Sequence, residues 1–318
     1  MKRLLFFICT LLCANVLMAQ EQLAVLRHND STRAFYGQTA FEQAYTAATH
    51  GDIITLSDGI FSTPSSINKA ITVRGNGAQA DTARRSTGTY FMEHFYVTCD
   101  TSEFVAEGIY FDWFDDYGAS CKIKLSKCII RHLDDISDAE ITNCIIKQND
   151  YSFTATTIMN SVIRCNNSSI PYHYADCRNS IIIGKGDIYE TYTQYSNCII
   201  INKSTTDTIV NNRTNNCVLI GWDSTSHIAS TDNVYMSVSD VFENWDGETI
   251  SYDLETYRLK SSVSDSIVGL DGSEVGIFGG FMPFDFLRPS YSIIKRFNVA
   301  NRTTADGKLS VDIEVISE

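Results

Sequence analysis

The stretch Asn143-Cys144-Ile145-Ile146-Lys147 decides the fold, because it is one of six copies of a single five-residue phrase. The third positions of successive copies are separated by 16, 17, 19, 18 and 19 residues. This period is too short for most helical repeats and too regular for chance. The other copies are Lys127-Cys128-Ile129-Ile130-Arg131, Asn160-Ser161-Val162-Ile163-Arg164, Asn179-Ser180-Ile181-Ile182-Ile183, Asn197-Cys198-Ile199-Ile200-Ile201 and Asn216-Cys217-Val218-Leu219-Ile220.

Each copy combines a corner residue with a short strand. The β-branched run has the composition of a buried strand. Asparagine, which begins five of the six copies, tolerates the left-handed backbone conformation that a tight corner needs. Its side-chain amide can also hydrogen-bond to the asparagine of the next layer. One corner and one strand in each repeat predict a coil whose turns stack like on like.

The composition at each position predicts which side chains face the interior. The second position is always Cys or Ser, the fourth is always Ile or Leu, and the fifth includes Arg131, Lys147 and Arg164. Side chains of a strand alternate between its two faces, and a face that accepts arginine is the outer one. We therefore expect the second and fourth positions to face inward, and the third and fifth to face outward.

This pattern resembles the right-handed parallel β-helix of secreted bacterial proteins of the pectin-lyase-like group. The resemblance covers residues 38 to 280 and predicts an all-β solenoid. A capping helix is expected near its start, because Thr39 and Glu42 have the spacing of a capping box, and Phe41, Ala44, Tyr45 and Ala48 share one helical face. The succession of short segments between residues 253 and 280 resembles the terminal coil of such proteins. The fold hosts lyases, hydrolases, adhesins and passive scaffolds, so it does not identify a function.

The two ends of the chain differ from the repeat region. Residues 1–20 have the basic start, short apolar run and small residue of a signal peptide, so we expect an exported protein: periplasmic, secreted or on the cell surface. Residues 21–282 are expected to form the β-helix domain with its cap. Residues 283–318 are expected to form a C-terminal β-hairpin or small β module. The net charge of −13 argues against nucleic acid as a partner, and the apolar run is too short to span a membrane.

Eight cysteines follow residue 20. An even number in an exported protein can indicate disulfides. Half of these cysteines, however, lie at the small second position of the repeat, where Ser also occurs. We expect these to be buried free thiols that act as small hydrophobic groups. No Cys/His spacing typical of zinc sites is present.

Acidic residues follow several strands. If Ile109 is taken as a third position, Asp115 and Asp116 lie six and seven residues after it. Asp134 and Asp135 lie five and six residues after the third position Ile129, and Asp150 lies five residues after the third position Ile145. Stacked at the strand spacing, such carboxylates repel one another unless they are protonated or bridged by a cation. Oxygen ligands suit Ca²⁺, which is the one cofactor that the sequence suggests. The candidate binding residues, including aromatic rings suited to a sugar, are Trp113, Asp115, Asp116, Tyr117, Arg131, Asp134, Asp135, Lys147 and Asp150.

Three functions are compatible with these residues. The chain has the features of a complete solenoid with caps but no recognisable catalytic constellation, which favours a non-catalytic glycan-binding protein or cell-surface scaffold. An acidic cluster beside basic residues also resembles polysaccharide lyase sites, so a Ca²⁺-assisted lyase or related carbohydrate-active enzyme is the alternative. An adhesin would share the same features.

Overall fold

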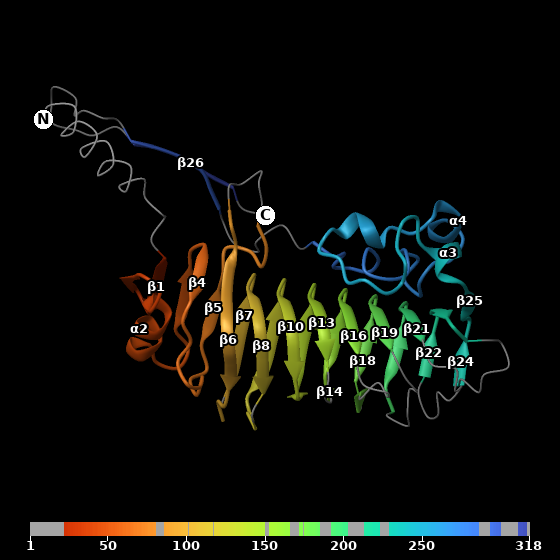
Figure 1. Ribbon diagram of the computed structural model, residues 1–318, viewed down its shortest axis with the longest axis horizontal. Helices are drawn as coiled ribbons and strands as arrows, with labels where there is room; N and C mark the ends of the chain where they lie inside the picture. Colours follow the sequence, from red (N-terminus) through yellow and green to blue (C-terminus); the bar gives the residue numbers. More distant parts are fainter. Residues whose placement is uncertain are drawn as a thin grey trace, which may run out of the picture.

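The computed structural model shows an elongated parallel β-solenoid (Figure 1). It describes residues 22–80, 86–100, 102–116, 118–149, 153–165, 172–173, 175–184, 192–202, 213–222, 229–285, 293–299 and 311–316. The expected signal peptide lies outside these residues. The predicted β-helix architecture is confirmed.

Sheet A has twelve strands. Strand β1 is antiparallel to both of its neighbours, β2 and β3, and from β3 onward all neighbouring strands are parallel. In spatial order the strands are β2 (Ser31–Tyr36), β1 (Leu23–His28), β3 (Ile53–Leu56), β5 (Thr72–Arg74), β7 (Glu103–Glu107), β9 (Lys122–Ser126), β12 (Ala139–Thr142), β15 (Thr157–Met159), β18 (Asp176–Arg178), β20 (Gln194–Ser196), β22 (Arg213–Asn215) and β24 (Ala229–Thr231).

Sheet B has ten parallel strands and contains the repeated phrase. From the C-terminal end they are β25 (Val234–Met236), β23 (Val218–Ile220), β21 (Ile199–Asn202), β19 (Ile181–Gly184), β16 (Val162–Cys165), β13 (Ile145–Asn149), β10 (Ile129–Asp134), β8 (Tyr110–Asp116), β6 (Thr89–Val97) and β4 (Gly59–Phe61). A third, three-stranded sheet comprises β11 (Ile136–Ser137), β14 (Phe153–Thr154) and β17 (Tyr172–His173).

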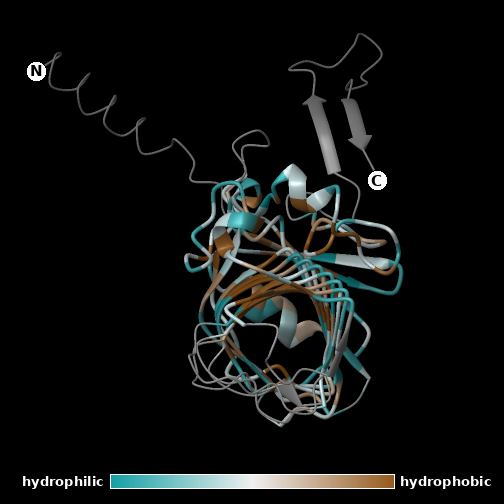
Figure 2. Cartoon of the chain, turned by 90° about the vertical axis from the view of Figure 1, so that its right-hand side faces the viewer, coloured by the Kyte–Doolittle hydropathy of each residue, from teal (hydrophilic) through white to brown (hydrophobic). Residues whose placement is uncertain are grey.

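The interior follows the predicted alternation. The second and fourth positions of all six copies are fully buried; apart from Ser161 and Ser180 they belong to the cluster that runs through the solenoid. In the view along the axis, hydrophobic strands line this interior (Figure 2). The small second position also links layers, because the Cys144 amide donates to Ser161 Oγ at 3.1 Å and the Ser161 amide donates to Ser180 Oγ at 3.2 Å.

The predicted left-handed corners are confirmed. Asn143, Asn160, Asn179, Asn197 and Asn216 have φ between 45° and 56°. Their side chains, however, do not have the partners expected from simple stacking. The Nδ2 of Asn160 donates to the carbonyls of Ile277 and Gly279 at 3.0 and 2.7 Å, and Asn197 Oδ1 accepts from the Leu270 amide at 2.8 Å. The asparagine column therefore binds a segment distant in sequence.

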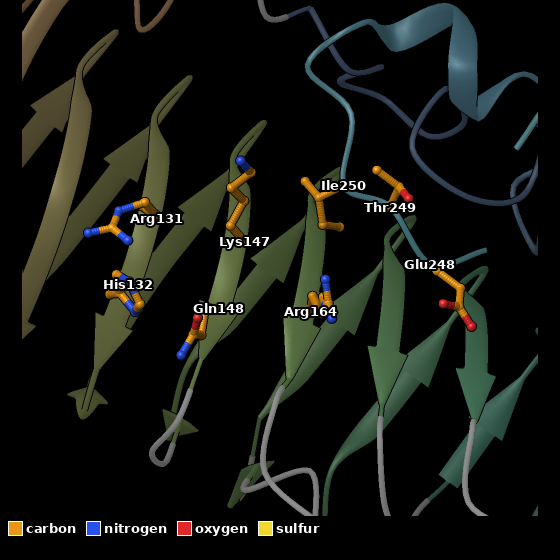
Figure 3. A pocket seen from close by; sticks show the side chains of 8 residues that line it. All are labelled: Arg131, His132, Lys147, Gln148, Arg164, Glu248, Thr249 and Ile250. Atoms are coloured by element: carbon orange, nitrogen blue, oxygen red, sulfur yellow. The ribbon is translucent and has the colours of Figure 1, made fainter. Parts of the chain in front are cut away.

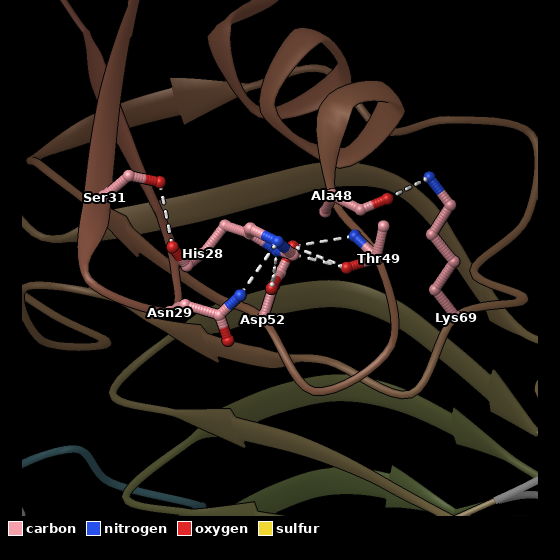
Figure 4. A network of polar contacts seen from close by, with 7 residues as sticks. All are labelled: His28, Asn29, Ser31, Ala48, Thr49, Asp52 and Lys69. Carbon is pink, nitrogen blue, oxygen red and sulfur yellow. Dashed lines mark hydrogen bonds and ion pairs between the residues drawn. The ribbon is translucent and has the colours of Figure 1, made fainter.

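The N-terminal end is closed by helix α2 (Ala40–Ala47), whose Phe41 ring packs 4.8 Å from that of Phe91. The predicted apolar helix face is confirmed, but the capping box is not formed, since the Thr39 side chain makes no cap hydrogen bond. The buried Asp52 carboxylate joins the helix end to β1 instead. It accepts from the Thr49 amide at 2.7 Å and contacts His28 Nδ1 at 2.8 Å (Figure 4).

The C-terminal arm, residues 237–285, packs against the outside of sheet B (Figure 1). It contains α3 (Val238–Val241), the 3₁₀ helix η1 (Leu254–Tyr257) and α4 (Ser261–Ser264). The expected terminal coil over residues 253–280 is therefore wrong: this stretch adds no strand to either sheet, and its end contacts the asparagine column from outside. The outward third positions, from Ile129 to Val218, are consequently buried beneath the arm.

The cysteines divide into two groups. Cys99 and Cys121 form a disulfide with a Cα–Cα distance of 5.6 Å, which the spacing of the repeat did not predict. The repeat cysteines are free and buried, as predicted, and so are Cys165 and Cys177. Burial raises the pKa of Cys128, Cys177 and Cys198, so these thiols stay protonated.

The predicted C-terminal hairpin pairing is present. Strands β26 (Ile293–Val299) and β27 (Val311–Ile316) are antiparallel.

Candidate functional site

The outer face of sheet B is uncovered where the arm ends, on β6, β8, β10, β13 and β16. Strands β8 and β10 each place two consecutive side chains outward between buried residues: Asp112 and Trp113 lie between buried Phe111 and Phe114, and β10 repeats the pattern. The resulting bend creates three outer columns. The charge column is Asp112, Arg131, Lys147 and Arg164; the ring column is His94, Trp113 and His132; the acid column is Tyr96, Asp115 and Asp134.

The ring column is a continuous stack. The Trp113 ring centroid lies 4.3 Å from that of His94 and 4.7 Å from that of His132, with interplanar angles of 21° and 19°. The two imidazoles therefore cover the two faces of the indole. A sugar ring stacked on Trp113, as expected from the sequence, would have to displace one of these imidazoles. Its Nε1 donates to Asp134 Oδ2 at 2.6 Å, which fixes that carboxylate.

The acid column shows that the register inferred from sequence was shifted by one residue. Ile129 pairs with Tyr110, not Ile109, so Asp115 lies directly opposite Asp134. Burial and the neighbouring carboxylates, chiefly Asp134, raise the pKa of Asp115 to about 6. The Asp115 carboxyl group can thus bind or release a proton near neutral pH. The Asp134 carboxylate is oriented by its hydrogen bond from the Trp113 indole.

The other predicted acidic residues do not converge on a ligand site. Asp116 is buried and accepts from the amides of Ala119 and Ser137, both at 2.9 Å, so it closes a turn. Asp135 is exposed beyond the end of β10. Tyr117 and Asp150 lie outside the described residues. Across the described residues, no three His, Cys, Asp or Glu side chains are placed to hold a metal ion, so the Ca²⁺ expectation has no site there.

The charge column is basic beyond its first member. Arg131 forms a two-point ion pair with Asp112, whose pKa the guanidinium lowers. Lys147 Nζ lies 4.8 Å from the centre of the Tyr252 ring, in a cation–π contact with the arm. For Arg164, the described part of the chain provides no ion pair or side-chain hydrogen bond. Among the described residues, the positive charge of the column is therefore less compensated toward β16.

A groove of about 490 Å³ runs between this column and the arm (Figure 3). Three cations converge on it, together with polar groups that can bond to hydroxyls. Its lining is Arg131, His132, Lys147, Gln148, Arg164, Glu248, Thr249 and Ile250. Of the residues predicted from sequence, the structure brings Arg131 and Lys147 to this groove and places Trp113, Asp115 and Asp134 beside it.

The sequence reasoning missed His94, His132 and the arm residues. The two histidines lie on strands whose bend breaks the simple alternation of faces, so a period-two pattern could not align them with Trp113. Glu248 and Thr249 carry no repeat signal. Arg164 shares the outward fifth position of the repeat with Arg131 and Lys147, and this shared position is the sequence signal that identifies it as part of the site.

Comparison with known proteins gives no relative: no protein-family model, curated protein or solved structure matches the chain significantly. Within the part of the chain that the structure describes, no helix has the length and apolar character needed to cross a lipid bilayer. Any functional assignment must therefore rest on the site itself.

Proposed function

We propose that this chain is an exported, non-catalytic β-helix protein of the pectin-lyase-like kind that binds an acidic glycan outside the cell. The observation that carries the proposal is the basic groove of Arg131, Lys147 and Arg164 on a chain whose net charge is −13. Cations gathered in a cleft attract an anionic ligand more strongly than the same charges dispersed over a surface.

The geometry favours a linear polyanion. The three cations come from three adjacent strands, so they are spaced along the solenoid at roughly the 4.8 Å separation of neighbouring strands. A polysaccharide with a carboxylate or sulfate on successive sugars can bind such a row, while His132, Gln148 and Thr249 can bond to its hydroxyl groups. Arg164 contributes most in this scheme, because none of the described residues forms an ion pair with it that a ligand would have to break.

Export is part of the same proposal. Residues 1–20 have the pattern of a signal peptide. The Cys99–Cys121 disulfide supports it, because structural disulfides persist in oxidising compartments. A cell-surface scaffold or adhesin is compatible with the same location.

The alternative is a carbohydrate-active enzyme that acts on the same acidic glycan. It is favoured by one observation, the Asp115–Asp134 pair beside the groove, in which one carboxyl group has a pKa of about 6. Incubation with acidic polysaccharides separates the two functions. Release of unsaturated or reducing sugar ends, lost in Asp115→Asn, would establish the enzyme, and binding without turnover supports the non-catalytic protein.

The test of binding is a titration with polygalacturonate, alginate and a sulfated glycan at low ionic strength. We expect at least one to bind, binding to weaken with added salt, and Lys147→Ala and Arg164→Ala each to reduce affinity at least fivefold. Arg27→Ala is the matched control, since Arg27 is an exposed arginine on β1 at the capped end. Absence of binding, or equal loss in the control, would overturn the proposal.

A further inference from the structure

A second groove lies on the opposite flank of the C-terminal arm. Its volume is about 450 Å³, and it runs between the arm and the outward side chains of β15, β18 and β20. Sheet A contributes Met159, Asp176, Arg178, Gln194 and Ser196; the arm contributes residues 270–271 and 280–282; asparagines of the corner column lie between them. Nothing in the acidic-glycan proposal uses this groove.

Its rim has an unusual concentration of exposed apolar side chains. Phe281 is 98% exposed, Leu270 is 65% exposed and Met282 is 49% exposed. All three come from the arm and line the same groove. An exposed aromatic ring at the edge of a concave site costs hydration free energy in the unbound protein, and its faces are open to a partner. This arrangement indicates a binding surface rather than a packing surface.

The floor of the groove is made of amides and one ion pair. The Asn179 side chain is buried against Gly279 and Gly280, where a Cβ atom would approach its amide within 2.9 Å. Its Nδ2 has no acceptor in the described residues. Arg178 forms a bidentate pair with Asp176, with an Nη2–Oδ2 distance of 2.5 Å. Gln194 adds a further exposed amide. Donors and acceptors are thus mixed without an excess of positive charge.

We propose that this second groove binds a neutral saccharide, with Phe281 against a face of the sugar ring and the Gln194 and Arg178–Asp176 groups bonded to its hydroxyls. An acidic ligand is disfavoured, because Asp176 and Asp271 outnumber the single Arg178 among the lining charges. Recognition of a peptide by strand addition is also disfavoured. Strands β15, β18 and β20 are paired on both sides within sheet A and leave no open backbone edge.

The experiment is affinity electrophoresis of the full chain in gels containing soluble neutral polysaccharides: β-glucan, glucomannan, xyloglucan and arabinoxylan. Neutral polymers do not alter migration through charge, so retardation reports binding. We expect at least one to retard the protein, and Phe281→Ala to weaken that retardation at least fivefold. Because Phe281 is almost fully exposed, its removal should leave the fold intact.

Tyr36→Ala is the matched control, since Tyr36 is also an exposed aromatic residue (59%) but lies on β2. Arg164→Ala should bind the neutral polymers normally, which keeps this test separate from that of the acidic-glycan groove. Retardation by none of the four polymers, or equal retardation of Phe281→Ala and the wild type, would overturn the proposal. Retardation abolished equally by Tyr36→Ala would overturn it as well, by assigning binding to the other end.

Discussion

The packing of the C-terminal arm on sheet B gives the sharpest test of the structure. Ile199 and Ile60 are both isoleucines on the outer face of sheet B, yet Ile199 is fully buried and Ile60 is 48% exposed. Only Ile199 lies under the arm, where it contacts Gly276. Replacing each with alanine removes the same three carbon groups from the same kind of strand. The difference between the two variants therefore measures burial by the arm.

The magnitude follows from the atoms removed. Three buried carbon groups are worth about 2.4 kcal/mol of transfer free energy at about 0.8 kcal/mol each. A cavity beneath the arm increases the loss toward the 2–5 kcal/mol range typical of isoleucine-to-alanine changes. At Ile60, a half-exposed site, we expect a loss of about 1 kcal/mol or less, mostly from lower strand propensity. Ile199→Ala should thus lower the free energy of unfolding by about 2 kcal/mol more than Ile60→Ala.

The assay is urea unfolding monitored by circular dichroism. The same measurement is made on Gly276→Ala, alone and combined with Ile199→Ala. Gly276 has φ of +80°, and a Cβ there would lie 2.9 Å from Ile199 Cδ1. Gly276→Ala should therefore destabilise the wild type through both strain and collision, but the Ile199→Ala variant through strain alone. Equal losses for Ile199→Ala and Ile60→Ala, with no coupling between residues 199 and 276, would refute the docking of the arm.

Two further predictions concern proton binding by Asp115 and the buried free thiols of the repeat. The pKa of Asp115 is raised to about 6 in the folded chain, against about 3.9 for an unfolded aspartate. Between these pH values the folded state binds more protons than the unfolded state. The free energy of unfolding should therefore fall as the pH rises from about 4 to 6. Thermal melts of Asp115→Asn across this range should lack that decline, with a gain on the order of 1 kcal/mol at pH 7 after allowing for solvent screening; an unchanged pH profile would contradict the assignment. Cys144→Ser should change the free energy of unfolding by less than about 1 kcal/mol, because Ser161 already makes the equivalent bond to a carbonyl two residues earlier, at 2.8 Å against 3.3 Å for Cys144 Sγ. Ile146→Ser on the same strand is its control and should cost several kcal/mol, so a comparable loss in Cys144→Ser, measured by urea unfolding, would argue against a simple structural thiol.

The solenoid could be predicted from sequence because its determinants are local and repeat. A β-branched pair next to a small residue fixes the face, and an asparagine fixes the corner; each layer then stacks on an identical neighbour. The alternation at Cys144, Ile146 and Lys147 was sufficient to place their side chains. The same reasoning failed for residues 276–280, since a Gly-rich turn has the same composition whether it ends a coil or lies against one.

The site was predicted only in part because its geometry depends on a bend and on non-local packing. Two outward residues in succession, as at Asp112 and Trp113, shift every later side chain on the strand by one position relative to a strict alternation. A separate error, the alignment of Ile109 rather than Tyr110 with Ile129, paired Asp115 with the wrong aspartate. No count along the chain could place Tyr252 against Lys147, because the two are joined only through the fold of the arm.

The residue type at the fifth position of the repeat nevertheless indicates which strands the arm covers. It is Arg, Lys and Arg in the first three copies and Ile in the last three. The structure buries Ile183, Ile201 and Ile220 to 4% exposure or less under the arm, and leaves Arg131, Lys147 and Arg164 at the open groove. An outward isoleucine is stabilising only where another segment covers it, and a basic residue there would carry an unpaired charge into the contact. The change between Arg164 and Ile183 thus marks the boundary between the part of the outer face that packs against the arm and the part that is available to a ligand. A basic residue substituted at Ile183 should therefore weaken the packing of the arm rather than extend the groove.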